Sequence, residues 1–143
     1  MRLWSNDFTE GQSIPDQCSL ENENTSPHLA WDGVPAGTRS FALICNDPDA
    51  RKKGWLHWLV HGIPSEVREI SSGAPVPGIE VENDFGKASW CGPAPRSGTH
   101  RYFFELYALG VPSLEGAKKA TFKKLCEKHS IDTAATIGVF SKK

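Results

Sequence analysis

Three largely apolar segments, each closed by proline or glycine, most constrain what this chain can fold into. They span residues 39–46, 55–63 and 101–109. Short apolar runs that are rich in bulky or aromatic residues and end in turn residues are typical of buried β-strands. Glycine and proline recur throughout the sequence, as expected for many short strands joined by turns. The sequence therefore predicts a mostly β fold.

Helical spacing is confined to the end of the chain. Ser113 stands where a helix N-cap would, and the residues that follow at helical spacing, with lysines between them, are Leu114, Ala117, Thr121, Leu125 and Cys126. We expect this helix to end at His129–Ser130. A second short helical segment is then expected before a last apolar stretch at 136–140, which gives one or two peripheral C-terminal helices.

Length and charge exclude several classes of protein. With 143 residues the chain is expected to form a single domain, 1–143. The net charge of −1 excludes the overall basic field on which non-specific nucleic-acid binding relies, so no nucleic-acid partner is expected. No run approaches the ~18 apolar residues of a membrane-spanning helix. The first residues lack the apolar region of a signal peptide, so we expect a cytoplasmic protein without integral membrane association.

The four cysteines do not form a metal-ligand pattern. They are widely separated and contain no CxxC pair, whereas structural zinc usually needs close ligand pairs. We expect them to be reduced, because nothing in the sequence directs the chain to an oxidising compartment.

Three segments beside the predicted strands carry groups capable of chemistry. Asp47-Pro48-Asp49 follows the first strand, His57 lies within the second, and a glycine- and proline-rich loop from 92 to 98 leads to His100 and Tyr102. Two carboxylates, two imidazoles, a phenol and glycine N–H groups fit three kinds of site. These are a divalent metal site, an Asp–His acid–base pair, and a pocket for a small anion.

Several ordered motifs give the chain a specific resemblance. It resembles the phosphatidylethanolamine-binding proteins, in their bacterial, Raf kinase inhibitor-like branch. The motifs are 24–31 (NTSPHLAW), 34–43 (VPAGTRSFAL), 47–50 (DPDA), 55–58 (WLHW), 92–95 (GPAP), 98–109 (GTHRYFFELYAL) and 137–140 (IGVF). The resemblance implies a β-sandwich with peripheral helices and a small cavity that binds phosphate or phosphorylated head groups. It also implies a cis peptide at Asp47–Pro48 and a homodimer.

The resemblance assigns the ligand pocket to six residues. They are Asp47, Asp49, His57, Gly92, His100 and Tyr102. We expect His57 and His100 to donate hydrogen bonds to the ligand while the two aspartates orient them. The Tyr102 hydroxyl and the N–H groups around Gly92 would supply further donors. No cofactor or metal is expected.

Four departures from the family pattern concern this pocket. Arg51 replaces a proline, Gly62 an asparagine and Trp90 a tyrosine, and Ala94 stands where a cysteine is usual. Trp90 is expected to remove a donor and narrow the mouth of the pocket. Arg51 and Arg96 could add positive charge at its rim or simply be exposed, solubilising residues.

Three functions follow as hypotheses. The first is a binding protein for small anions that performs no turnover. The second is a hydrolase that uses a metal or an Asp–His pair in the same pocket, although no serine or cysteine stands in a recognisable nucleophile motif. The third is an interaction protein whose pocket controls a surface for an unidentified protein partner. The lipid selectivity and kinase inhibition of eukaryotic members are not carried over.

Overall fold

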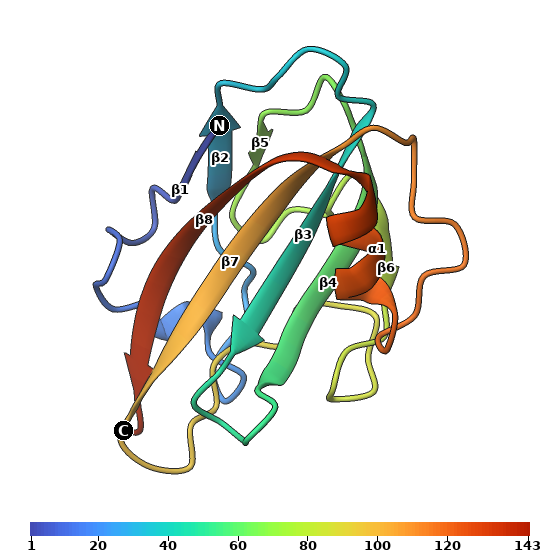
Figure 1. Cartoon of the computed structure of the whole chain (residues 1–143). Coiled ribbons are helices and arrows are strands. Elements are labelled where there is room, and N and C mark those ends of the chain that lie inside the picture. Colours follow the sequence, from blue (N-terminus) through green and yellow to red (C-terminus); the bar gives the residue numbers. More distant parts are fainter.

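The computed structural model describes residues 1–143 and contains two antiparallel β-sheets and a single short α-helix (Figure 1). The smaller sheet has the order β1 (Arg2–Trp4), β2 (Leu29–Asp32), β5 (Glu69–Ile70). The larger has the order β6 (Ile79–Val81), β4 (Trp55–Pro64), β3 (Ser40–Asp47), β7 (Thr99–Leu109), β8 (Ser130–Ser141). A 3₁₀ turn, η1, covers Asp16–Cys18, and α1 covers Phe122–His129. The predicted mostly β class is confirmed.

The central strand β3 is apolar at almost every position because both faces of the large sheet are buried. Phe41 and Leu43 pack into the core between the two sheets. Ala42 and Ile44 point the other way and pack beneath α1, with Phe122. Successive side chains of a strand point to opposite faces, so two cores require a continuous apolar run. All four cysteines are free and buried.

The C-terminal helix is shorter than predicted. It begins at Phe122 rather than near Ser113, and its N-cap, Thr121, makes no capping hydrogen bond with its side chain. Gly116 adopts a φ of +76°, which a right-handed helix cannot contain, so the segment before Thr121 forms turns. The helix ends at His129, as predicted. None of the helical segments has the length and apolar character needed to cross a bilayer.

The prediction of a second helical segment after His129 is wrong. Residues 130–141 form β8, which pairs with β7 from Leu109 to Thr99. The edge of β7 that does not pair with β3 offers backbone hydrogen bonds to this segment, and isoleucine, threonine and valine suit such a strand. The end of β8 lies at the start of β7, where the amide of Lys142 donates to the carbonyl of Gly98 over 2.9 Å.

Strand β4 contains two irregularities that matter for the site. Leu56 pairs with Asn46 and Trp58 with Cys45, so the pairing between β3 and β4 skips His57. A bulge of this kind re-aims the side chain of the extra residue. The second bulge contains Gly62, whose φ is +63°. Glycine and asparagine are the residue types that most readily adopt this conformation, which explains why either can occupy the position.

The Asp47–Pro48 peptide is trans, as are all peptide bonds of the chain, so the expected cis bond is wrong. The turn after β3 is instead fixed by a side chain. Oδ1 of Asp47 accepts a hydrogen bond of 2.8 Å from the backbone amide of Asp49. Asp47 itself remains in the ladder, opposite Trp55. An aspartate that bonds the amide two residues on forms an Asx turn, which needs no unusual peptide geometry.

Candidate functional site

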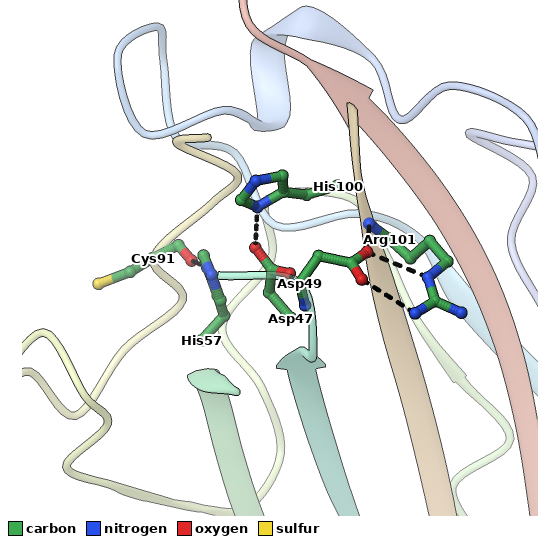
Figure 2. Close-up of polar contacts among 6 residues, drawn as sticks. All are labelled: Asp47, Asp49, His57, Cys91, His100 and Arg101. Carbon is green, nitrogen blue, oxygen red and sulfur yellow. Dashed lines mark hydrogen bonds and ion pairs between the residues drawn. The ribbon is translucent and has the colours of Figure 1, made fainter. Parts of the chain in front are cut away.

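A cavity of about 490 Å³ lies at the end of the large sheet where β3 ends and β4 and β7 begin (Figure 2). It is lined by Asp47, Asp49, Ala50, Arg51, Trp55, His57, Phe85, Ala94, Arg96, Ser97 and His100. Four of the six residues assigned by the resemblance therefore share one cavity. The antiparallel order of β4, β3 and β7 brings them together, because the end of β3 lies between the starts of its two neighbours.

Asp47 and His100 form the buried polar pair of the site. Nδ1 of His100 donates to Oδ2 of Asp47 over 2.7 Å, and the Asp47 side chain is only 2% exposed. Because Oδ1 already accepts from the Asp49 amide, both oxygens of Asp47 have a partner within the chain. Asp47 thus orients His100, as the sequence predicts, and does not present an unpaired charge to the cavity.

Asp49 is held by Arg101 on the outer side of the site. The guanidinium donates to the carboxylate from Nε over 3.0 Å and from a terminal nitrogen over 2.9 Å, and the Arg101 amide adds a third bond of 2.9 Å. The side-chain hydrogen bond from Arg101 lowers the pKa of Asp49 to about 2. Sequence reasoning gave Arg101 no role, and no local spacing could have paired two residues that are 52 positions apart.

His57 projects from the bulge of β4 into the floor of the cavity. Its Nδ1 donates to the carbonyl oxygen of Cys91 over 2.5 Å. Its ring meets the rings of Phe85 and Tyr102 edge-on, with centroids 5.1 and 5.2 Å away. The side chain is 2% exposed, and this burial lowers the pKa of His57. His57 is therefore a neutral, rigidly held imidazole at neutral pH.

Gly92 and Tyr102 do not line the cavity. The amide of Gly92 donates to Oδ1 of Asn24 over 2.7 Å, and a Cβ at this glycine would lie 1.8 Å from the carbonyl oxygen of Cys18. Gly92 thus permits a close approach between two loops. Tyr102 is fully buried, and its hydroxyl has no hydrogen-bond partner. Burial, reinforced by the nearby Asp47 carboxylate, raises the pKa of Tyr102.

Two residues that the sequence did not single out shape the site. Asn83 is fully buried, and its side-chain amide donates to the carbonyl oxygens of His57 and Ser89, both over 2.9 Å. Its Oδ1 accepts from the amide of Phe85 over 2.9 Å, which places that aromatic ring against His57. The turn residues Asn83, Asp84 and Gly86 were the available signal, because Asx turns favour such residues.

The departures from the family pattern fall in different places. Arg51, Arg96 and Ala94 line the cavity, and the guanidinium of Arg51 lies 4.7 Å from the centre of the Trp55 ring. Trp90 does not narrow the mouth, contrary to expectation. It is 5% exposed, belongs to the core between the sheets, and donates from its indole N–H to the Cys18 carbonyl over 3.1 Å. The large aromatic ring is accommodated by the core.

The charges around the cavity are unequally paired. Both carboxylates that line it, those of Asp47 and Asp49, already bond His100 and Arg101. Neither Arg51 nor Arg96 forms an ion pair within the chain. No group of three or more histidine, cysteine, aspartate or glutamate side chains is arranged to hold a metal ion. The arrangement therefore offers two guanidinium groups without an ion-pair partner around a small hollow.

Comparison with known proteins identifies the family. The family model described as phosphatidylethanolamine-binding protein matches residues 4–141. A UPF0098 protein of Methanothermobacter thermautotrophicus is 40% identical over 98% of this chain and 98% of its own. The UPF0098 protein YbhB of Escherichia coli is 38% identical over 99% of this chain and 100% of its own. These relatives come from an archaeon and a bacterium, so they do not assign the chain to a bacterial branch.

Solved structures agree in fold as well as in sequence. The crystal structure of Escherichia coli YbcL, described as a new member of the mammalian PEBP family, superimposes with a TM-score of 0.92 and 32% identity. It covers 99% of this chain and 98% of that one. A putative phosphatidylethanolamine-binding protein homologue from Chlamydia trachomatis gives a TM-score of 0.91 and 31% identity, over 99% and 97%. The chain therefore belongs to the phosphatidylethanolamine-binding protein family.

Proposed function

We propose that this protein binds small anions, phosphate or a phosphorylated head group, in the cavity at the end of β3, and does not turn them over. The main support for this proposal is that the carboxylates of the cavity are paired within the chain while two of its guanidinium groups are not. The two carboxylates of the cavity are bonded to partners within the chain, whereas Arg51 and Arg96 form no ion pair. An anion entering the cavity meets unpaired guanidinium groups and avoids unpaired carboxylates, which favours its binding.

The size of the cavity supports a small ligand. A volume of about 490 Å³ lies in the usual range for small-molecule sites, and the lining is mainly polar side chains with two aromatic rings, Trp55 and Phe85. A phosphate or a head group fits such a volume more readily than acyl chains do. The family description names phosphatidylethanolamine binding. For this chain we propose the shared phosphate chemistry rather than recognition of an intact lipid.

The absence of turnover is part of the proposal. Ser97 lines the cavity, whereas the His100 ring bonds Asp47 and the His57 ring bonds the Cys91 carbonyl. Figure 2 shows the Cys91 sulfur directed away from His57, which contacts the carbonyl oxygen of the same residue. Nucleophilic catalysis needs a nucleophile within reach of an activating base, so the direction of this sulfur supports the proposal that the site only binds its ligand. The hydrolase alternative has no specific observation in its favour and stays a hypothesis.

Assembly and location stay predictions. The only large apolar side chains that are well exposed are Ile79 and Ile131, on β6 and β8. These are the two opposite edge strands of the large sheet, so they do not form one apolar face that would require a partner. A homodimer, a further protein partner and a cytoplasmic location are therefore expectations from the sequence and the resemblance alone.

Binding should be measured by isothermal titration with inorganic phosphate, phosphoethanolamine and acetate. We expect phosphate to bind, and we expect Arg96→Ala to weaken its affinity by roughly tenfold, since a hydrogen bond to a charged group contributes about 1.5–3 kcal/mol. We expect His100→Ala to weaken it as well, because His100 lines the cavity and is held in place by Asp47. His129→Ala and Arg39→Ala are matched controls, because neither residue lines the cavity. If the parent protein binds none of the three anions at millimolar concentration, or if His100→Ala binds phosphate as well as the parent, the proposal is wrong.

A further inference from the structure

The hydrogen bond between His57 and Cys91 fixes which ring nitrogen carries a hydrogen. Nδ1 of His57 lies 2.5 Å from the carbonyl oxygen of Cys91. A carbonyl oxygen can only accept, so Nδ1 must be the donor and must carry the hydrogen. In a neutral imidazole the other nitrogen, Nε2, then has a lone pair and no hydrogen. Nε2 of His57 is therefore an acceptor, contrary to the expectation from sequence that His57 donates a hydrogen bond to the ligand.

The surroundings of His57 keep its ring neutral. Rings of Phe85 and Tyr102 cover it, and burial lowers its pKa below the ordinary histidine range. The groups that oppose this shift are the carbonyls of Cys91 and Gly92 and the carboxylates of Asp47 and Asp84. Both oxygens of Asp47 are already bonded to other groups, so Asp47 does not bind the ring. Burial has the largest effect and lowers the pKa of His57, so the ring is uncharged at pH 7.

The hydrogen bond from Nδ1 to Cys91 is the one side-chain hydrogen bond that His57 forms within the chain, and the residue lines the cavity. Figure 2 shows the His57 ring near Asp47 and His100, with the Cys91 carbonyl on its other side. A ligand oxygen without a hydrogen would place its lone pairs against the lone pair of Nε2. A ligand oxygen with a hydrogen would instead donate to it. A ligand bound in this anion site must therefore donate a hydrogen bond at the wall formed by His57.

We propose that His57 makes this cavity selective for oxyanions that carry their own hydrogen, namely hydrogen phosphate and singly protonated phosphomonoesters, over sulfate and phosphodiesters. The inference rests on the proposed function, because it concerns the ligand of the same cavity. At neutral pH hydrogen phosphate and sulfate share a tetrahedral shape and a charge of about −2, but only phosphate retains a hydrogen. Sulfate binds only if a proton is taken up from solvent onto Nε2.

The selectivity is measured with inorganic phosphate and sulfate as matched probes, by isothermal titration at pH 7 and constant ionic strength. We expect phosphate to bind at least about 30-fold more tightly than sulfate, because a site that holds a buried acceptor rejects an analogue lacking the donor. Titrations in two buffers of different ionisation enthalpy give the number of protons that the protein takes up when each ion binds. Residual sulfate binding should take up about one proton per ion, and phosphate binding clearly less.

A second pair of probes separates free phosphomonoesters from phosphodiester head groups. At pH 6 about half of methyl phosphate carries a hydrogen, since the second pKa of a phosphomonoester is about 6, whereas dimethyl phosphate carries none. We expect methyl phosphate to bind at least about tenfold more tightly than dimethyl phosphate. Equal binding of the two esters would show that the chain does not select the free monoester and would contradict the inference.

Variants at two buried histidines of β4, His57 and His61, test whether His57 causes the selectivity. His57→Gln can turn an amide N–H toward the cavity, so we expect the ratio of phosphate to sulfate affinity to fall at least about tenfold. His61→Gln is the control, because His61 is buried on the same strand and does not line the cavity. It should leave the ratio unchanged. If His57→Gln does not fold, the affinity ratio and proton count of the parent protein decide.

The outcomes distinguish this inference from the proposed function. Equal affinities for phosphate and sulfate, without proton uptake by either, overturn the role of His57 and leave anion binding intact. An unchanged ratio of phosphate to sulfate affinity in a folded His57→Gln variant also overturns the role of His57 and leaves anion binding intact. Failure of both ions to bind overturns the proposed function, and the inference falls with it.

Discussion

Nδ1 of His100 donates to Oδ2 of Asp47 over 2.7 Å and so joins the start of β7 to the end of β3. We predict that Asp47→Ala lowers the free energy of unfolding by about 2 kcal/mol, because it leaves the His100 N–H and the Asp49 amide without an acceptor. Asp47→Asn keeps an acceptor oxygen and should cost less. Urea unfolding of both variants measures the difference.

Asp32→Ala is the control for this prediction. Asp32 bonds Arg2 over 3.3 Å on the exposed surface, where an ion pair contributes at most about 1 kcal/mol. An Asp47→Ala variant no less stable than Asp32→Ala would show that the buried bond is not stabilising.

Asp49 gives the fold a stability that depends on acid pH. Its folded pKa of about 2 lies below the value of about 3.9 in an unfolded chain. Ionised Asp49 therefore stabilises the fold above about pH 4, and this contribution is lost as the pH falls through about 2. We predict that the difference in unfolding free energy between the parent and Asp49→Asn is constant above pH 5 and closes between pH 4 and pH 2. A pH-independent difference would contradict the Asp49–Arg101 pair.

Protonation of His61 at lower pH should weaken its contact with the loop before α1. Its Nδ1 accepts the amide of Leu114 over 3.0 Å, and burial lowers the pKa of His61 below its ordinary value near 6.5. The neutral ring stabilises the fold at higher pH, and the contribution is lost as the pH falls below 6.5 through the folded pKa. We predict that protection of the Leu114 amide from hydrogen exchange, corrected for the intrinsic rate, falls between pH 7 and pH 5. Constant protection would show that the ring does not titrate in this range.

Gly92 and Gly98 should differ sharply in their tolerance of alanine. A Cβ at Gly92 would lie 1.8 Å from the Cys18 carbonyl, whereas at Gly98 it meets nothing within 4 Å. We predict that Gly92→Ala costs about 3 kcal/mol or more of stability, by overpacking. Gly98→Ala should cost about 1 kcal/mol, from its φ of +64° alone. Thermal unfolding compares them, and similar midpoints would contradict the close approach of the two loops.

The Tyr102 hydroxyl should contribute nothing favourable to the fold. It is buried without a hydrogen-bond partner, a situation that costs roughly 1–3 kcal/mol. We predict that Tyr102→Phe is as stable as the parent or more stable by about 1 kcal/mol, measured by urea unfolding. Phosphate affinity should not change, since the hydroxyl does not line the cavity. A clear loss of affinity would restore Tyr102 as a ligand donor.

The parts of the fold predicted from sequence are those where one physical requirement dominates. The run 39–46 predicts β3 because a strand buried on both faces must be apolar at nearly every position. The start of α1 was wrong because Leu114 and Ala117 recur at helical spacing while Gly116 adopts a left-handed conformation. β8 was missed over 130–135 because its pairing with β7 is a long-range contact that local spacing does not contain.

The candidate site shows the same limit. The turn after β3 and the residues at the start of β7 are visible as motifs, so Asp47, Asp49 and His100 could be placed together through the resemblance. The orientation of His57 depends on a bulge, and the partners of Asp49 and Gly92 are Arg101 and Asn24, which are distant in sequence. Individual hydrogen bonds between loops leave no pattern in the amino-acid order, so these roles required the three-dimensional structure.

The end of β8 beside Gly98 has a practical consequence for any laboratory that prepares this protein (Figure 1). An affinity tag or fluorescent fusion attached after Lys143 would emerge next to the loop that borders the cavity and could shield it from titrants. A tag before Met1 would emerge elsewhere, but it would remove the ammonium group that lies 3.0 Å from the Asp132 carboxylate. A cleavable C-terminal tag, taken off before titration, preserves both features.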